Sequence, residues 1–453
     1  MPLNGQLAVV VLTAGRGSRM RSSLPKILHP IAGLPMIEHI VRAVESLQPL
    51  QTIMVTGPTS EVLHAEYGER VQFAWQAEPL GTGHAVQAAL PVLDPGAQWV
   101  MVVFGDHPLT DGATLQSLLH EVDNARPVVA MLAVELDDPG AYARFQMEDG
   151  RVTGLVEARD DHTVHDGPVT VNSGICCFSR AWLEEHLPQV PVSASGEIYL
   201  TSLIEVAAAE EHPNPVTLVL GEPEVAFGVN NRAELSEAER IIRRRINRQH
   251  MLAGVTLVDP DSTYIDADVE IGEDTRIEPG AIVRRGSRIG GGCVIGPAAV
   301  IEDSTIGDWV TVRSSFVQSS VIDDDADVGP YAHLRPGTRI ASGVHIGNYV
   351  ETKNATVGSG THIGHFSYIG DAEIGSRVNV GAGTITCNFD GFQKHKTTVG
   401  DDVFIGSDTM LVAPVEVGEG ARTGAGSVVT KPVPPGATVV GVPARLIRRS
   451  RGE

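Results

Sequence analysis

The sequence predicts a Rossmann-like α/β domain followed by a parallel β-helix made of hexapeptide repeats. Aliphatic residues recur at intervals of six through the second half of the chain, and apolar runs alternate with helical patterns through the first half. The chain has 453 residues, of which 42% are hydrophobic and 5% aromatic. That length suits two or three domains with sizeable aliphatic cores.

The six-residue period occupies residues 264 to about 429. Neither the period of a helix nor that of a strand generates it, whereas a hexapeptide repeat does. Each hexapeptide then forms one face of a triangular coil, with its aliphatic residue pointing inward, and three hexapeptides make one coil. The first members of the series are Ile265, Ile271, Ile277, Val283, Ile289, Ile295 and Ile301.

The repeat has two kinds of irregularity. Intervals of five, as from Thr352 to Val357 and from Ile369 to Ile374, mark places where a turn must tighten. Between Ile385 and Val399 the period fails altogether. This interruption predicts a loop that leaves the prism, and such loops commonly carry function.

The first half of the chain begins with a continuous apolar run rich in β-branched residues, typical of a strand buried on both faces. Further runs of this kind alternate with helical patterns, which predicts a mostly parallel sheet covered by helices, with ligands beyond the carboxyl ends of its strands. We expect strands at 7–13, 52–56, 71–75, 99–104 and 128–134, and helices at 36–47, 84–90 and 114–122.

The pattern changes after residues 228–232. Apolar residues from Leu235 to Ile246 form one helical face with arginines around it, and we interpret this segment as a solvated connecting helix. The expected division is therefore residues 1–232 for the α/β domain, 233–253 for the linker helix and 254–453 for the β-helix domain.

Bulk composition excludes several classes of partner. A net charge of −22 argues against general binding to nucleic acid or acidic membranes. No apolar run is long enough to span a bilayer, and the N-terminus lacks the pattern of a secretory signal. The four cysteines show no metal-ligand spacing and indicate reduced thiols in a cytoplasmic protein.

A glycine turn, Gly15-Arg16-Gly17, follows the first expected strand. It is not the dinucleotide fingerprint, because Met20 occupies the place of the third glycine, and it is not a Walker A loop. Its backbone N–H groups can bind phosphate oxygens, and Arg16 and Lys26 can neutralise a polyphosphate.

The stretch from Leu12 to Met20, followed by Leu24-Pro25-Lys26, resembles the opening of sugar-nucleotide pyrophosphorylases. With the hexapeptide tract behind it, the chain from residue 7 to about 445 is similar to the bacterial family of bifunctional N-acetylglucosamine-1-phosphate uridylyltransferases and glucosamine-1-phosphate acetyltransferases. Further matching segments are Gln76 with 81–83, 104–106, 156–157, 171–174 and 228–232.

The resemblance implies an α/β Rossmann-like nucleotidyltransferase domain, a left-handed parallel β-helix and a homotrimer. The first domain would transfer UMP from UTP to N-acetylglucosamine-1-phosphate, with Arg16 and Lys26 on the triphosphate and oxygen atoms of Asp106 and Asn230 on Mg²⁺. The residues implied to hold the nucleotide and the sugar are Leu12, Ala14, Gly15, Gln76, Gly81, Thr82, Ala143, Glu157, Asn172 and Asn230.

Polar residues on the repeat concentrate at 333–337, 348–353 and 362–368. The coil length stacks Arg335 on Lys353, which suits an anionic substrate. The resemblance implies that His365 is the general base that deprotonates the amine of glucosamine-1-phosphate before it attacks acetyl-CoA, since an imidazole titrates near neutral pH. Implied contacts are Arg335, Lys353, Tyr368 and Asn379 for the sugar phosphate, and Ala382, Asn388, Phe389, Ser407 and Ala425 for acetyl-CoA; Glu351 would help to orient the catalytic groups.

Three residues depart from the pattern of the family. Ala143 stands where the family usually has a glycine beside the sugar, which bears on the fit of the sugar. Phe389 replaces a frequent tyrosine in the looped-out segment. Gly441 stands where a basic residue can contact coenzyme A, and Arg445, Arg448 and Arg449 are nearby substitutes.

Two other functions fit parts of the sequence. The β-helix could serve only as a scaffold for trimerisation, in which case replacing His365 would cost no activity. A zinc enzyme could use histidines spaced by one coil or across a subunit boundary, but the stacked cations Arg335 and Lys353 would then be unexplained. The candidate ligands for zinc are His333, His345, His362 and His365.

Overall fold

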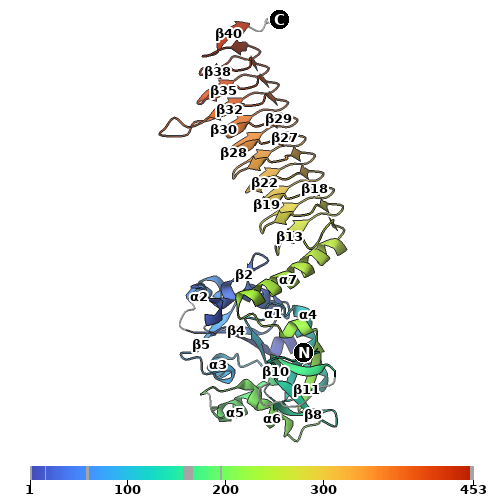
Figure 1. Ribbon diagram of the computed structural model, residues 1–453. Helices are drawn as coiled ribbons and strands as arrows, with labels where there is room; N and C mark the ends of the chain where they lie inside the picture. Colours follow the sequence, from blue (N-terminus) through green and yellow to red (C-terminus); the bar gives the residue numbers. More distant parts are fainter. Residues whose placement is uncertain (1–2, 16, 58–60, 157–166, 194–195, 449–453) are drawn as a thin grey trace. The chain divides into compact units, whose positions relative to one another are not determined.

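The computed structural model describes residues 3–15, 17–57, 61–156, 167–193 and 196–448. The chain divides into two compact units, Met1–Ile242 and Arg243–Glu453 (Figure 1). Within the described ranges no helix is both long and apolar enough to cross a membrane.

The first unit is built on one twisted sheet with the strand order β11-β7-β10-β6-β1-β4-β5. The central strand β1 pairs in parallel with β4 and β6, as the sequence predicts. The sheet is mixed, however, because β10 runs antiparallel to both of its neighbours. The strands are β1 (Leu7–Leu12), β4 (Gln51–Thr56), β5 (Gln72–Trp75), β6 (Trp99–Phe104), β7 (Val129–Leu136), β10 (Val169–Ser179) and β11 (Val216–Gly221), with the hairpin β8 (Arg144–Glu148) and β9 (Arg151–Val156) attached to β10.

Two apolar cores cover the two faces of this sheet. Alternate residues of β1 enter opposite cores: Val9 packs in one and Val10 in the other, and both are fully buried. The expected helices are present as α1, α3 and α4. The helices of the first unit are α1 (Met36–Glu45), α2 (Glu61–Tyr67), α3 (Thr82–Ala89), α4 (Gly112–Ala125), α5 (Arg180–His186) and α6 (Leu203–Ala208), followed by α7 (Arg232–Leu252), which runs into the second unit.

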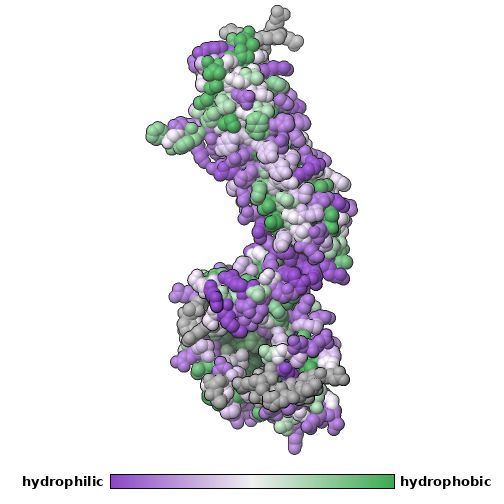
Figure 2. Space-filling model, viewed as in Figure 1, coloured by the Kyte–Doolittle hydropathy of each residue, from purple (hydrophilic) through white to green (hydrophobic). Residues whose placement is uncertain are grey.

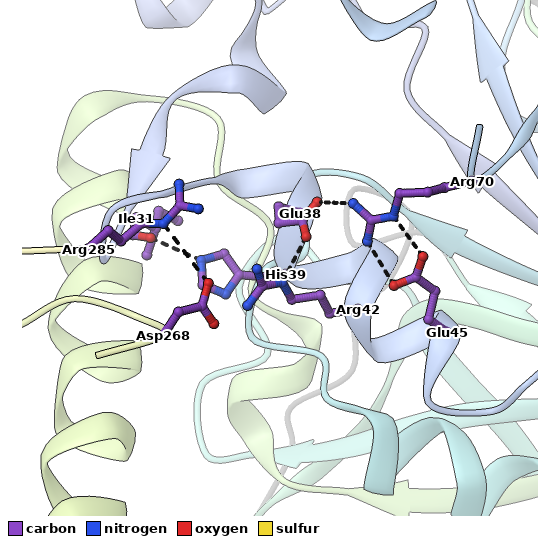
Figure 3. A network of polar contacts seen from close by, with 8 residues as sticks. All are labelled: Ile31, Glu38, His39, Arg42, Glu45, Arg70, Asp268 and Arg285. Atoms are coloured by element: carbon purple, nitrogen blue, oxygen red, sulfur yellow. Dashed lines mark hydrogen bonds and ion pairs between the residues drawn. The ribbon is translucent and has the colours of Figure 1, made fainter. Parts of the chain in front are cut away.

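A polar network fastens α1 to the segment that follows α2 (Figure 3). Glu38 accepts hydrogen bonds from Arg42 at 2.7 Å and from Arg70 at 2.8 Å, and Arg70 also reaches Glu45. Burial of the Glu38 carboxyl alone would raise its pKa, but the hydrogen bonds from Arg70 and Arg42 outweigh burial and lower it. Glu38 is therefore charged and paired, as a buried carboxylate must be.

The second unit is a left-handed parallel β-helix. Its strands run from β12 (Thr256–Leu257) to β40 (Arg445–Arg448) and form a sheet of 12 strands on one face and a sheet of 17 strands on the other two. The inward aliphatic residues stack into one continuous core, as the six-residue period predicts; Ile271, near its beginning, is only partly buried. The strands that carry the site are β25 (His333–Leu334), β27 (His345–Asn348), β28 (Glu351–Val357), β29 (His362–His365), β30 (Tyr368–Ile374), β31 (Asn379–Val380) and β32 (Ile385–Cys387).

Residues with positive φ angles form the corners of the prism. The tight five-residue intervals contain one such corner residue each, for example Asn354 at 46° and Asp371 at 47°. Asn, Asp and Gly adopt this left-handed conformation at the lowest cost, which explains why they punctuate the repeat.

Both ends of the β-helix are closed. At the far end, β40 pairs antiparallel with β39 (Thr438–Val440) and ends the parallel stack. At the first coil, Arg243 of α7 is buried, donates a hydrogen bond to the carbonyl of Ile265 at 3.1 Å and lies over the ring of Tyr264. The expectation that all arginines of this helix are solvated is therefore wrong for Arg243.

The interruption between Ile385 and Val399 is a loop that leaves the prism beside β30 (Figure 1). Its two sides form an antiparallel bridge between Phe389 and Lys394. Phe389 and Phe392 are 60% and 96% exposed, so the loop presents apolar rings to its surroundings (Figure 2). The expected excursion is confirmed, and it is an ordered hairpin, which we call the excursion hairpin (residues 388–395).

Candidate functional site

The first candidate site lies where β1 and β6 end. The ammonium group of Lys26 contacts the carboxylate of Asp106 and lies 3.3 Å from the amide oxygen of Asn230, which also accepts from Arg19 at 2.9 Å. Three of the residues proposed for triphosphate and metal thus meet at one point. The side-chain oxygen atoms of Asp106 and Asn230 both face one position, which the ammonium group of Lys26 occupies.

Local backbone geometry places Asn230 at this point. Asn231 caps α7 by accepting from the backbone N–H of Glu234 at 3.0 Å, and Glu234 accepts from the backbone N–H of Asn230 at 2.6 Å. This pair resembles a capping box, except that the glutamate holds the backbone N–H of the residue before the cap, and it fixes the entry into the helix. The backbone N–H of Val229 also bonds the carbonyl of Asp106 at 2.9 Å. Asn231 is therefore a capping residue, whereas Asn230 is free to face the site.

Gly17 allows Lys26 to reach Asp106. Its φ angle is 59°, and a Cβ atom there would lie 2.7 Å from the Cβ atom of Lys26. A larger residue would be strained and would displace the lysine. Arg16 and Glu157 lie outside the described residues, so their predicted roles stay predictions.

A second group of predicted residues lies around the start of α3. Gln76 is buried, with its side-chain nitrogen 3.3 Å from the carbonyl of Gly81 and 3.0 Å from His84. Gly81 has a φ angle of 99°, and a Cβ atom there would lie 2.5 Å from the carbonyl oxygen of Ile198. Gln76, Gly81 and the first residue of α3, Thr82, therefore belong to one rigid turn.

The remaining residues proposed for the nucleotide follow β1. Leu12 ends that strand opposite Phe104 of β6. Ala14 lies against Gly57, where an added Cβ atom would be 3.7 Å from the Ala14 side chain, and nothing would meet a Cβ atom at Gly15. Ala14 and Gly15 thus form an open backbone segment at the carboxyl end of β1, where a ligand is expected in such sheets.

A cavity of about 420 Å³ opens beside this turn. It is lined by Thr82, Ala143 and Asn172, which were assigned to the nucleotide and the sugar, and by deeper apolar side chains such as Ile204. Asn172 stands at the bulge of β10, and its backbone N–H donates to the carbonyl of Ala143 at 2.9 Å. Ala143, which departs from the family pattern, is thus part of the cavity wall.

His107 lines the same cavity, although the sequence pattern did not single it out. Its ring stacks on Phe104 with centroids 5.1 Å apart. Burial lowers the pKa of His107, with Asp106 acting in the opposite direction. The ring is therefore neutral near pH 7. The sequence could have marked His107 as a site residue through its position directly after Asp106.

The second candidate site lies on the β-helix. Leu334 and Thr352 are register partners, and the backbone N–H of Arg335 bonds the carbonyl of Thr352, so Arg335 stacks on Lys353 as expected. The guanidinium of Arg335 donates to Glu351 at 2.7 Å. Glu351 therefore neutralises Arg335 and lies opposite Tyr368 in the ladder. Its expected part in orienting the catalytic groups stays a prediction.

Lys394 joins these cations from the excursion hairpin. Its ammonium group is the main cause of a lowered pKa at Lys353, and Arg335 adds to the effect. The sequence pattern missed Lys394 because it falls in the segment without a period. Three cations near one another form a site for an anion such as a phosphate.

His365 lies across the corner from these cations. It ends β29 in the 12-stranded sheet and is exposed, and its Nδ1 atom lies 2.8 Å from the amide oxygen of Asn348 on the preceding coil. Asn379 occupies the same sheet, opposite His362. The corner residue Phe366 separates this face from Tyr368, so the base and the cations approach the corner from two faces.

The residues proposed for acetyl-CoA occupy one corner of three successive coils. The carbonyl of Ala382 accepts from the backbone of Asp408, and that of Ser407 accepts from the backbone of Gly426, which follows Ala425. A Cβ atom at Gly381 would lie 2.5 Å from the backbone nitrogen of Ser407. This edge is narrow, and its small residues leave the backbone accessible.

The excursion hairpin places Asn388 and Phe389 differently. The side chain of Asn388 is buried and donates to Asp371, whereas Phe389 is exposed. Gly441, the third departure from the family pattern, has a φ angle of 96° in the turn between β39 and β40. A glycine suits that conformation better than a basic residue would.

The hypothesis of a zinc site on the prism requires a cluster of metal ligands. Among the described residues, no group of three or more histidines, cysteines or acidic residues could hold a metal ion. His345 pairs with Asp327 at 2.9 Å, and His333 lies 3.0 Å from Gln318. These histidines are engaged in the ladders of the prism.

Comparisons with known proteins place both units in known families. A family model described as a MobA-like NTP transferase domain matches residues 9–193, and one described as a bacterial transferase hexapeptide (six repeats) matches residues 396–431. The chain is 44% identical over 433 residues to the "Bifunctional protein GlmU" of Heliobacterium modesticaldum, covering 95% of this chain and 94% of that protein. It belongs to the GlmU family.

Two further GlmU relatives show the same extent of similarity. The protein of Trichlorobacter lovleyi is 43% identical over 433 residues and that of Streptococcus agalactiae serotype V is 41% identical over 434 residues, with 94% of each covered. The similarity therefore spans both units and both candidate sites. The α/β unit agrees with an NTP transferase, and the β-helix agrees with a hexapeptide transferase.

Proposed function

We propose that this member of the GlmU family acetylates glucosamine-1-phosphate with acetyl-CoA and then transfers UMP from UTP to the product. The final products are UDP-N-acetylglucosamine and pyrophosphate. The observation that carries this proposal is the presence of two distinct constellations in two units. Lys26 meets Asp106 and Asn230 beside a cavity, and His365 lies across a corner of the prism from a cluster of cations.

In the uridylyltransferase site, the sugar phosphate must approach the α-phosphorus of UTP although both are anions. Lys26, with Arg16, binds the triphosphate. The donor set of Asp106 and Asn230 fits Mg²⁺, since it offers one carboxylate and one neutral oxygen and already surrounds an ammonium group. Bound Mg²⁺ would neutralise charge on the transferring group and on the departing pyrophosphate.

The other residues of this site bind and orient the two substrates. Leu12, Ala14, Gly15, Gln76, Gly81 and Thr82 hold the uridine nucleotide, which the rigid turn from Gln76 to Thr82 supports. Ala143, Glu157 and Asn172 hold the sugar, which the cavity lined by Ala143 and Asn172 supports. Because the protein forms no covalent bond, positioning and charge stabilisation supply the rate enhancement.

In the acetyltransferase site, Arg335 and Lys353 bind the phosphate of glucosamine-1-phosphate, and Lys394 joins them. Tyr368 and Asn379 hold the sugar. His365 removes a proton from the amine so that the nitrogen can attack the thioester of acetyl-CoA, which lies along Ala382, Ser407 and Ala425 with Asn388 and Phe389 at its side. The exposed imidazole and the narrow edge of small residues support this arrangement.

The wider assignment follows from the family. We propose that residues 1–232 form the uridylyltransferase domain, 233–253 the linker helix and 254–453 the acetyltransferase domain, and that three copies assemble through their β-helices. The exposed rings of Phe389 and Phe392 support an association between copies. The four free cysteines suit a cytoplasmic location. The product would supply peptidoglycan and lipopolysaccharide synthesis.

Product analysis tests the proposal. The protein is incubated with glucosamine-1-phosphate, acetyl-CoA, UTP and Mg²⁺, and mass spectrometry follows the nucleotide sugars. We expect UDP-N-acetylglucosamine with all substrates present. Without acetyl-CoA, no acetylated product should form, and added N-acetylglucosamine-1-phosphate should restore it. Failure to restore it would contradict the uridylyltransferase, whereas a complete mixture that forms no product until N-acetylglucosamine-1-phosphate is added would contradict the acetyltransferase.

A further inference from the structure

We propose that Asn348 positions the catalytic base, because its amide oxygen holds the ring of His365 in the tautomer that leaves Nε2 free to accept a proton. This inference rests on the proposed acetyltransferase function and extends it to a residue to which neither the repeat pattern nor the family resemblance gave a role. Asn348 touches the base and is therefore a positioning residue.

The backbone brings the two side chains together. Asn348 and His365 are register partners in the parallel ladder of β27 and β29, which stacks their side chains on adjacent coils. The backbone N–H of Phe366 donates to the carbonyl of Asn348 at 2.9 Å, and the hydroxyl of Ser367 donates to the carbonyl of His365 at 2.8 Å. The backbone on both sides of the imidazole is thus held, and the 2.8 Å contact from Nδ1 to Asn348 Oδ1 orients the ring.

The chemistry of this contact selects one tautomer. An amide oxygen only accepts hydrogen bonds, so Nδ1 of His365 must carry the proton. In the neutral ring, Nε2 then holds the lone pair. Nε2 forms no hydrogen bond within the described part of the chain, so it is available to the substrate amine. The opposite tautomer would lose the bond to Asn348 and would place no base at Nε2.

A comparison within the same ladder shows what the amide contributes. His345 lies on β27 and pairs with a carboxylate, that of Asp327, at 2.9 Å. His365 faces an amide instead, and it forms no ion pair among the described residues. The titratable residues on the surrounding elements are His345 on β27, His362 on β29 itself, Glu351 and Lys353 on β28, Tyr368, Asp371 and Glu373 on β30, and the corner residues Tyr349 and Asp408. An amide orients the imidazole without adding the negative charge that a carboxylate would place beside it.

The substitution Asn348→Asp tests this inference. The carboxylate keeps an acceptor at the same place but adds a charge that stabilises the imidazolium. We expect the acidic limb of the kcat profile for thiol release from acetyl-CoA to move to higher pH by about 1 unit or more. At the alkaline plateau, kcat should return close to the wild-type value, and KM for both substrates should change little.

The substitution Asn348→Ala removes the acceptor. We expect kcat to fall by about 10- to 100-fold at every pH, because the ring loses its tautomer and its orientation, while KM stays within about twofold. The matched control is Gln318→Ala, which removes the amide partner of His333 on another strand of the prism and should leave thiol release unchanged.

The outcomes separate the inference from the function on which it rests. A pH profile of Asn348→Asp that superimposes on that of the wild type would overturn the positioning role, as would a loss in Asn348→Ala that lies in KM alone. Absence of thiol release from the wild type would instead contradict the proposed acetyltransferase. Circular dichroism and acetyl-CoA binding by each variant establish that its prism is folded.

Discussion

The carboxylate of Asp106 is paired with the ammonium group of Lys26 at the end of the central strands of the α/β sheet. These two residues belong to segments far apart in the sequence, and Asn230 adds a neutral oxygen to the same point. A cation-binding position therefore exists in the folded chain before any nucleotide binds. With substrates bound, Lys26 would hold the triphosphate, and the oxygen atoms of Asp106 and Asn230 would hold Mg²⁺.

The substitution Asp106→Asn should abolish this arrangement. We expect pyrophosphate release from UTP to fall by roughly 100-fold or more, because the charge of the carboxylate proposed to bind Mg²⁺ is lost. Thiol release from acetyl-CoA, measured on the same sample, should stay at the wild-type rate. Retention of uridylyl transfer by this variant would show that Asp106 does not bind the metal. The neighbouring exposed residue Asp111, which caps α4, provides the control Asp111→Asn.

Removal of divalent metal should separate the two activities. A chelator is expected to stop pyrophosphate release, since Mg²⁺ neutralises the transferring group, and to leave thiol release unchanged. Added Mg²⁺ should restore the first activity. Loss of thiol release in the chelator would instead favour the zinc alternative for the prism, although the described residues offer no cluster of three ligands.

The cation cluster on the prism predicts a binding defect for Lys394→Ala. Removal of this ammonium group from beside Lys353 should raise KM for glucosamine-1-phosphate by about tenfold, because phosphate affinity depends on the summed charge, and should change kcat less. Higher ionic strength should weaken binding by the wild type in the same direction. Lys431→Ala, at an exposed lysine elsewhere on the prism, is the control. An unchanged KM in Lys394→Ala would remove this residue from the site.

The excursion hairpin should keep its order in acid. The pKa of Asp390 is lowered to about 2 by the backbone N–H of Gln393, the side chain of His395 and the backbone N–H of Phe392. Its ordinary value is 3.8, so the bonds of its carboxylate stabilise the hairpin fully above that pH and are lost as the pH falls toward 2.

Selective ¹⁵N labelling of phenylalanine checks this expectation. The amide resonance of Phe392, assigned with the variant Phe392→Leu, should remain constant from pH 6 to about pH 4 and then shift with a midpoint near 2. A midpoint close to 3.8 would mean that the carboxylate of Asp390 is not engaged. The variant Asp390→Asn should show the shifted resonance at every pH.

Much of the fold could be predicted from the sequence because each face of the prism takes one hexapeptide, so the six-residue period reveals the architecture directly. The position of Lys353 above Arg335 followed from the coil length alone. The antiparallel strand β10 could not be foreseen, since both of its faces are buried and an apolar run does not reveal strand direction.

The candidate sites were less accessible to sequence reasoning. Asn348 and His365 are 17 residues apart, whereas Arg335 and Lys353 stack over a longer coil. A difference of one residue in coil length changes which side chains are predicted to stack. Lys394 lies in a segment with no period. The capping pair of Asn231 and Glu234 was readable from their spacing, and it would have distinguished Asn231 from Asn230 at the outset.

The most direct test of two activities in one chain is thiol release from acetyl-CoA with glucosamine-1-phosphate, comparing the wild type with His365→Ala. Pyrophosphate release from UTP, measured on both proteins, is the internal control. We expect the wild type to release thiol and the variant to lose roughly 100-fold or more of that rate while its uridylyl transfer is unchanged. Equal thiol release by both proteins would remove His365 as the base, and no release by a wild type active in uridylyl transfer would reduce the β-helix to a scaffold.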